Sequence, residues 1–183
     1  MTAINNSLPA FSFNDQPQIY VACLASYNNG ELHGQWIDAT QEVEEIKKQI
    51  AMMLSDSPEP GAEEYVIHDD MGFYDLEIEE YDSIEDVQEK AMFILEHGEL
   101  GAKVAAYYGG DLEDAQKSMN ENYQDAYKSE LDYAIAFFDE CYLDTVPESV
   151  RFYIDYESFK TDIFIDTCFS IELGGKSHIF FQH

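Results

Sequence analysis

Residues 19–38 have the sequence IYVACLASYNNGELHGQWID, which indicates two β-strands joined by a turn-rich segment. The apolar run over residues 19–26 contains Ile, Tyr and Val, residue types that are enriched in strands. A second short strand is predicted at residues 35–38. Asn29-Gly30 between apolar runs is typical of a hairpin, although this connection is longer than a two-residue turn. The folded part of the chain is therefore expected to begin with an antiparallel strand pair.

The segment after this pair has the apolar spacing of a helix. Thr40 is predicted to be its N-cap, acidic residues occupy its first turn, and Lys47 and Lys48 follow, as the helix dipole favours. Pro and Gly within residues 57–61 end it. Further strands predicted at residues 64–68 and 76–78 would complete a small α+β region. The expected buried residues of the helix are Val43, Ile46, Ile50, Met53 and Leu54.

The middle of the chain, residues 84–122, is predicted to be helical. Ser83 and Asp86 resemble a capping box, and Gly98 lies where a glycine commonly ends a helix. A short helix is expected to reach about Tyr108, where two glycines interrupt the pattern, and Asp111 is predicted to cap the next helix. The expected buried stripe of the first helix is Ile84, Val87, Ala91, Ile94 and Leu95.

The last region, residues 123–183, combines helices with a C-terminal hairpin. Ser129 and Asp132 form another capping pair, and Pro147 suits the first position of a helix. A further helix is predicted over residues 156–165. Strands at residues 169–173 and 178–181, joined by Gly174-Gly175, form the predicted hairpin. The helix after Ser129 is expected to turn Leu131, Ile135, Phe138 and Cys141 inward.

The chain is strongly acidic, with 38 Asp and Glu against 9 Lys and Arg and a formal net charge of -29 in 183 residues. Because apolar residues make up 45% and aromatic residues 14%, a folded body with an acidic surface is expected rather than a disordered acidic tail. Such a charge argues against direct binding to nucleic acid or to anionic membranes, both of which require basic residues at the contact.

Compartment signals in the sequence are few. No apolar run approaches the roughly 18 residues needed to span a bilayer. The start of the chain lacks the basic and apolar regions of a signal peptide, and residues 1–17 are predicted to form a flexible N-terminal arm. Cys23, Cys141 and Cys168 suit buried free thiols in a reducing compartment. A cytoplasmic protein is therefore expected.

The acidic residues are unevenly distributed. No basic residue occurs between Lys48 and Lys90, while carboxylates recur throughout that stretch. Acids three or four positions apart on a helix lie about 5–6 Å apart, a spacing comparable with that of DNA phosphates. A DNA-mimicking surface is one interpretation; a solvated face and a salt-adapted proteome are alternatives. The predicted acidic surface comprises Glu63, Glu64, Asp69, Asp70, Asp75, Glu77, Glu79, Glu80, Asp82, Glu85, Asp86, Glu89, Asp111, Glu113 and Asp114.

Catalytic and metal-binding patterns do not rise above background. The acidic stretch at residues 69–77 lacks the alternating ligands and closing Glu of an EF-hand loop. The five histidines have no zinc-ligand spacing, and His68 and His97 are interpreted as structural. No phosphate-binding loop, nucleophile elbow or redox C-x-x-C is present. No enzymatic activity, metal or cofactor is therefore predicted.

Several separated segments resemble the ArdA family of antirestriction proteins. They are residues 19–38, residues 62–69 (AEEYVIHD), residues 146–148 (VPE), and residues 153–159 (YIDYESF) with Asp162. The resemblance implies a protein of mobile genetic elements that inhibits type I restriction–modification enzymes. It would occupy the DNA-binding groove of the methyltransferase core, block DNA binding competitively and protect incoming DNA.

The resemblance also implies a fold and an assembly. The expected fold is an α+β, elongated chain of three small domains at residues 18–83, 84–122 and 123–183, forming a homodimer through the C-terminal domain. Residues 131–144 resemble the family's antirestriction motif and its dimer-interface region; the alternative is that their apolar residues belong to the monomer core. The implied residues are Leu131, Tyr133, Ala134, Phe137, Phe138, Asp139 and Glu140.

Two other functions remain open from the residues alone. The first is an acidic adaptor or chaperone that sequesters another basic, nucleic-acid-binding protein. The second is a Ca²⁺-dependent regulatory protein, since the acidic surface would attract the ion.

Overall fold

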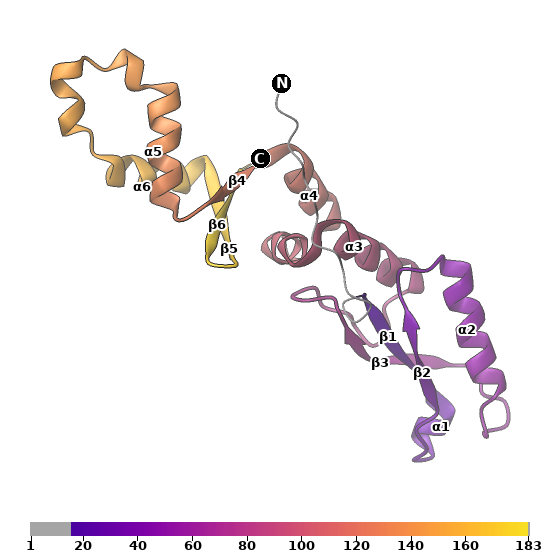
Figure 1. Cartoon of the computed structure of the whole chain (residues 1–183). Helices are drawn as coiled ribbons and strands as arrows, with labels where there is room; N and C mark the ends of the chain where they lie inside the picture. Colours follow the sequence, from indigo (N-terminus) through magenta and orange to yellow (C-terminus); the bar gives the residue numbers. More distant parts are fainter. Residues whose placement is uncertain (1–15, 183) are drawn as a thin grey trace. The chain divides into compact units, whose positions relative to one another are not determined.

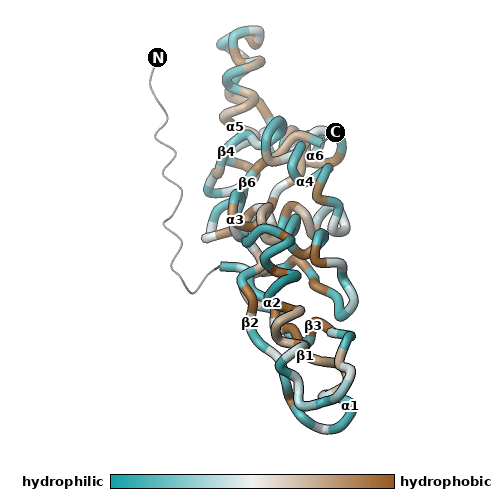
Figure 2. Tube along the Cα trace, turned by 90° about the vertical axis from the view of Figure 1, so that its right-hand side faces the viewer, coloured by the Kyte–Doolittle hydropathy of each residue, from teal (hydrophilic) through white to brown (hydrophobic). Residues whose placement is uncertain are grey.

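The computed structural model describes residues 16–182 as a mixed α+β protein (Figure 1). The chain divides into two compact units, residues 1–102 and residues 103–183. The division falls inside the region predicted to be a separate middle domain, and the three-domain layout stays a prediction. Most of the predicted N-terminal arm, residues 1–15, lies outside the described residues. Figure 2 shows that hydrophilic and hydrophobic residues alternate along the chain.

The first unit contains a three-stranded antiparallel sheet in the order β2-β1-β3. β1 spans Gln18–Cys23, β2 spans Gly34–Asp38 and β3 spans Tyr65–Met71. Ile19 pairs with Ile37 on β2, and Val21 pairs with Ile67 on β3. The predicted strand pair is therefore confirmed, and the strand predicted at residues 64–68 is longer than expected.

The first strand is shorter than predicted. Residues 24–28 do not continue β1 but form the short helix α1 (Leu24–Asn28), whose end leads into the Asn29-Gly30 turn. β1 and β2 are thus joined through a helical turn instead of a simple hairpin loop. Gly34 permits the close approach of the two strands, because an added Cβ there would lie 2.4 Å from the carbonyl oxygen of Val21.

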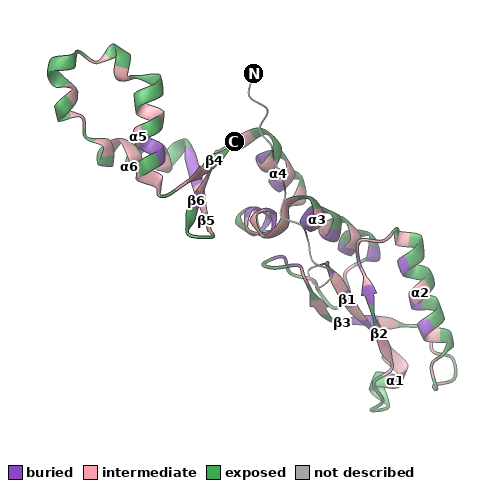
Figure 3. Cartoon of the chain, in the orientation of Figure 1, coloured by how far each residue is buried: buried purple, intermediate pink, exposed green. Residues whose placement is uncertain are grey.

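Helix α2 (Val43–Ser55) packs against β1 and β2 and buries Ile46, Ile50 and Met53. Figure 3 shows these buried positions on one side of the helix and exposed positions on the other. The predicted Thr40 cap is wrong, because α2 begins three residues later and Glu42 occupies the N-cap position. Thr40 instead donates two hydrogen bonds to Asp38 Oδ1, of 2.8 Å from its backbone nitrogen and 2.6 Å from its hydroxyl.

Residues 76–78 do not form the predicted strand. Leu76 is buried, and the segment after it runs past β3, to which it is joined where Ile67 N donates a 3.1 Å hydrogen bond to Glu80 O. Phe73 is also fully buried. The apolar residues that suggested a strand here anchor an irregular connection instead.

Helix α3 (Ile84–Tyr107) begins and bends as the sequence predicts. The Ser83 hydroxyl accepts a 3.1 Å hydrogen bond from Asp86 N. At Gly98 the backbone is non-helical, with φ 61° and ψ -153°, a conformation that glycine adopts far more readily than other residues. Gly98 therefore separates two helical segments. The predicted stripe is buried except for Leu95, which is half-buried.

The second unit contains helix α4 (Leu112–Lys117), which Asp111 caps by accepting a 3.0 Å hydrogen bond from Asp114 N. A π-helical turn, η1 (Ser118–Asn122), follows and leads into β4 (Tyr123–Tyr127). The sequence analysis did not predict β4. This strand pairs with β6 (Lys176–Phe181) in a second antiparallel sheet of order β4-β6-β5.

The C-terminal hairpin is confirmed. β5 (Cys168–Leu173) pairs with β6, and Gly174 and Gly175 connect them with φ values of 60° and 72°, as in a type I′ turn. Two 3₁₀ helices, η2 (Leu143–Thr145) and η3 (Glu148–Tyr153), precede α6 (Tyr156–Asp166). Pro147 is thus adjacent to a 3₁₀ turn instead of opening an α-helix.

Helix α5 (Glu130–Cys141) packs against α6, β4 and β6, and Ser129 caps it by accepting from Asp132 N. The inward side of this helix differs from the prediction. Leu131, Ile135 and Phe138 are half-buried, and Cys141 is exposed. The core cluster around α5 is formed by Tyr133, Ala134, Ile163, Cys168 and Ile179.

Candidate functional site

The predicted acidic surface is exposed at every position except Asp70 and Asp82, which are half-buried. Its members up to Glu89 belong to the first unit, and its members from Asp111 onward belong to the second. Exposure follows from the local structure. In the first unit, loop residues 63–64 and 77–80 and the solvent side of α3 carry most of these carboxylates, while the apolar residues between them, such as Leu76 and Ile84, are buried.

Two lysines of the first unit pair with members of this surface. Lys47 Nζ lies 2.5 Å from Glu85 Oε1, linking α2 to the start of α3, and Lys90 Nζ lies 2.7 Å from Asp82 Oδ2. Lys90 also donates a 2.9 Å hydrogen bond to Glu77 O. Because no basic residue occurs between Lys48 and Lys90, residues 63–89 keep a large negative excess.

The two half-buried carboxylates differ electrostatically. Partial burial raises the pKa of Asp82, but hydrogen bonds from Lys90 and from Glu79 N outweigh it and hold the pKa below its usual value. At Asp70, burial and the neighbouring Asp69 raise the pKa, and the more distant Lys90 offsets this only in part. Asp82 thus forms a structural ion pair with Lys90, whereas the negative charge of Asp70 is only partly offset by a positive charge.

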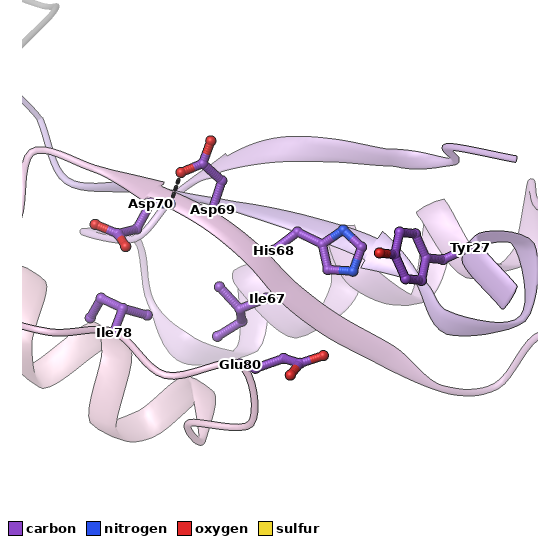
Figure 4. A pocket seen from close by; sticks show the side chains of 7 residues that line it. All are labelled: Tyr27, Ile67, His68, Asp69, Asp70, Ile78 and Glu80. Carbon is purple, nitrogen blue, oxygen red and sulfur yellow. Dashed lines mark hydrogen bonds between the residues drawn. The ribbon is translucent and has the colours of Figure 1, made fainter. Parts of the chain in front are cut away.

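A hollow of about 460 Å³ lies along β3 in the first unit (Figure 4). Figure 4 shows the rings of Tyr27 and His68 facing each other at one end and Asp70 beside Ile78 at the other. The two rings make an edge-on contact with centroids 4.3 Å apart. The hollow is lined by Tyr27, Ile67, His68, Asp69, Asp70, Ile78 and Glu80.

A second hollow of about 510 Å³ adjoins the first and shares Asp70 and Ile78 with it. Its lining is again acidic with a small apolar part. A β-bulge in β3 lies beside the first hollow: Tyr20 pairs with Asp69 and Val21 with Ile67, so His68 is the extra residue on β3. A bulge redirects side chains and bends the strand. The second hollow is lined by Asp70, Tyr74, Asp75, Leu76, Glu77, Ile78 and Glu79.

Sequence reasoning found the acids of these hollows but not their other walls. It placed Tyr27 in a turn and interpreted His68 as structural. The signals that would have suggested more are local: Tyr27 precedes an Asn-Asn-Gly turn, and His68 stands between a buried apolar pair and two aspartates. The bulge that brings Tyr27 and His68 together depends on pairing with β1, which no local pattern encodes.

The residues that resemble the antirestriction motif divide between core and surface. Tyr133 and Ala134 are buried in the second unit, and the Tyr133 ring stacks on Phe137 with centroids 5.7 Å apart. Burial raises the pKa of Tyr133. Phe138 is half-buried against Phe159, at a centroid distance of 5.0 Å. Leu131 is also half-buried, and the exposed members are Asp139 and Glu140.

Between residues 16 and 182, no three or more His, Cys, Asp or Glu side chains are grouped so that they would hold a metal ion. None of the helices in that part of the chain is long and apolar enough to cross a membrane.

Comparison with protein families identifies the chain. The profile of the antirestriction protein family ArdA matches residues 19–176, nearly the whole chain. The chain belongs to the ArdA family. It is therefore an antirestriction protein, and the family resemblance predicted from separated segments is confirmed. A search among curated proteins finds no match.

Proposed function

We propose that this ArdA protein acts as a DNA mimic against type I restriction–modification enzymes. It would bind the DNA-binding groove of the methyltransferase core and block DNA binding competitively. The observation that carries the proposal is the exposure of the carboxylates of residues 63–89, a stretch without a basic residue until Lys90. An enzyme that grips phosphates with Lys and Arg would meet fixed negative charges there.

The physical basis is the electrostatics of phosphate binding. A groove that neutralises DNA phosphates releases counterions, so its affinity falls steeply with salt. Carboxylates on α3 such as Glu85 and Glu89 are one helical turn apart, about 5–6 Å between Cβ atoms. The protein presents negative charges but no nucleotide bases, so the enzyme cannot recognise a base sequence in it. Inhibition should therefore not depend on the DNA recognition sequence of the enzyme.

The proposal includes the assembly and the location of the protein. A cytoplasmic homodimer would double the negative surface available to one enzyme. Asp139 and Glu140 are the exposed members of the motif-like segment, whereas Tyr133 and Ala134 serve the monomer core. The dimer contact would therefore use the outer side of α5. Light scattering after size exclusion would give the mass of the particle.

A competition titration tests the mechanism. A type I methyltransferase core is first bound to fluorescently labelled cognate DNA, and the purified protein is then added at two salt concentrations. We expect displacement at near-stoichiometric amounts and weaker displacement at the higher salt concentration, because salt screens charge contacts. The protein alone should give no mobility shift of duplex DNA, which is the matched control for direct competition on the nucleic acid.

The opposite results are equally informative. A folded protein that leaves the core bound to DNA would contradict the mimic mechanism while leaving family membership intact. The same result together with binding to another basic, nucleic-acid-binding protein would favour the acidic adaptor. A direct shift of duplex DNA by the protein would indicate that it acts on the DNA instead of the enzyme.

A further inference from the structure

The hollow of Figure 4 differs from the rest of the acidic surface in having aromatic and apolar walls as well as carboxylates. We propose that this hollow binds one arginine side chain of the partner protein. The identity of that partner rests on the proposed function, but the chemistry of the hollow does not. The remaining acids would attract the partner through their summed negative charge, so that any one of them could be replaced with little effect. This hollow would instead bind one specific side chain of the partner.

The walls of the hollow suit a side chain with a long apolar stem. Ile67 is 5% exposed and Ile78 is half-buried, and both line the hollow, so methylene groups would find apolar contacts. Long basic side chains commonly bury their stems along such surfaces and leave the charged head among polar groups. Tyr27, whose exposed fraction is 53%, offers an aromatic ring that solvent and ligands reach.

The charge of the hollow is negative and locally uncompensated. Asp69, Asp70 and Glu80 all line it, and within residues 16–182 no lysine or arginine forms an ion pair with these three. Lys90, whose charge lowers the pKa of Asp70 in part, is already bonded to Asp82 and to Glu77 O. The raised pKa of Asp70 is consistent with a carboxylate that gains when a cation arrives.

Arginine fits these walls better than lysine does. Its guanidinium is planar, stacks on aromatic rings, carries five donors and is more weakly hydrated than an ammonium group. Because Asp70 and Tyr27 lie at opposite ends of the hollow, the charged head would lie near Asp70 and the apolar stem would extend toward Tyr27. The carboxylates of Asp69, Asp70 and Glu80 line the hollow and could accept hydrogen bonds from the guanidinium donors. Such charge-assisted hydrogen bonds are stronger than those between neutral groups.

The test uses the purified full chain and needs no restriction enzyme. N-acetyl-arginine-methylamide is titrated into isotopically labelled protein and followed by NMR, with N-acetyl-citrulline-methylamide as the uncharged isostere. The variants are Asp70→Asn and the charge-matched Asp166→Asn, which lies at the exposed end of α6 in the other unit. Both remove one carboxylate, so both reduce the general attraction for a cation equally.

We expect saturable shifts for the arginine probe at Tyr27, His68, Asp70 and Glu80, and none for the citrulline probe. Asp70→Asn should weaken binding by about tenfold, because a charge-assisted hydrogen bond is lost. Asp166→Asn should change it by less than about twofold, as a distant surface charge does. Tyr27→Ala should weaken binding less than Asp70→Asn does, because it removes apolar contact with the stem and no charge, whereas Tyr27→Phe, which keeps the ring, should change little.

Non-saturating shifts spread over all exposed acids would overturn the proposal, as would equal effects of Asp70→Asn and Asp166→Asn or equal binding of the citrulline probe. These outcomes are separable from failure of the proposed function. If the protein displaces DNA but the hollow fails this test, mimicry stands without a discrete arginine contact. If the hollow binds arginine but DNA is not displaced, the hollow serves a different arginine-bearing partner.

Discussion

Residues 63–89 of the first unit and residues 127–164 of the second both mix acidic with aromatic and aliphatic residues, yet the two stretches use them differently. In the first, the carboxylates cover an irregular connection and a helix, and two hollows open between them. In the second, aromatic rings contact one another around Tyr133 and build the core. Net charge is therefore a property of the whole chain, whereas an acidic site with a defined shape is confined to one region.

The first prediction concerns the aromatic core of the second unit and should give the greatest change in stability. Tyr133→Ala should lower the free energy of unfolding of the second unit by about 3–5 kcal/mol, because it removes a large ring from a packed core. Tyr153→Ala is the matched control, since this tyrosine is 80% exposed and its removal should cost little. Denaturant unfolding followed by tyrosine fluorescence measures both. Equal stability of the two variants would contradict the assignment of Tyr133 to the core and Tyr153 to the surface.

The second prediction tests the acidic side. Changing Glu63, Glu64, Glu77 and Glu79 to Gln should weaken inhibition about tenfold, because four charges are lost from the proposed contact. The set leaves the Asp82–Lys90 pair and the hollow of Figure 4 intact. DNA displacement from the methyltransferase core is the measurement. The control changes four exposed acids of the second unit to their amides: Asp144, Glu148, Asp162 and Asp166.

A weaker effect of the first set than of the control set would move the binding surface to the second unit. Equal effects of the two sets would mean that total charge alone governs inhibition. The position of the acids in the first or the second unit would then not matter for function.

The third prediction concerns the serine N-caps of α3 and α5, which should contribute equally to stability. Ser83 caps α3 and Ser129 caps α5, each by accepting a hydrogen bond of 3.1 Å from the backbone three residues later. Ser83→Ala and Ser129→Ala should each cost about 1 kcal/mol of stability, and the corresponding glycine variants should cost less. Thermal unfolding of all four variants would check this. A cost near zero for either alanine variant would show that its cap is redundant.

The smallest expected effects separate the two half-buried aspartates of the first unit. The lowered pKa of Asp82 stabilises the fold above its unfolded pKa, about 3.9, and this stabilisation is lost as pH falls through the lower folded pKa. Asp82→Asn should therefore cost about 0.5–1 kcal/mol at neutral pH and nothing in strong acid. The raised pKa of Asp70 has the opposite sign: it penalises folding above the folded pKa, and the penalty vanishes below about 3.9.

Asp70→Asn should accordingly stabilise the protein slightly at neutral pH and leave its stability in acid unchanged. Denaturant unfolding at several pH values measures both variants. If Asp70→Asn destabilised the protein at neutral pH, the carboxylate would have a structural partner, and the hollow would lose its proposed role.

The local patterns that predicted structure well are those whose physics is local. Ser83 and Ser129 were correctly predicted as caps because a hydroxyl and a backbone N–H three residues away suffice to make the bond. Gly98 and the glycine pair at residues 174–175 were predicted as breaks because few other residues adopt a positive φ. Thr40 failed as a cap because α2 begins only at Val43, and its hydroxyl donates to Asp38 Oδ1 instead.

Features that depend on distant partners were missed. β4 carries Gln124 and Asp125 and has little apolar alternation, and it becomes a strand by pairing with β6. Residues 24–26 were predicted to continue the first strand but belong to α1, where Leu24 N donates to Glu64 O. For β4 and α1, a partner far along the chain accompanies the departure from the local prediction. Cys141 has helical spacing with buried residues but lies at the exposed end of α5.

The acidity of the chain, its mixed α+β character, most of its helix caps and breaks, and its resemblance to the ArdA family could all be inferred from the amino-acid sequence. Those properties follow from residue types and short-range spacing. Only the tertiary structure decided that Tyr133 and Ala134 are core residues and that a bulge at His68, the Tyr27 ring and the segment at residues 78–80 enclose one hollow. Strand register and packing are cooperative, so they place side chains that no local pattern brings together.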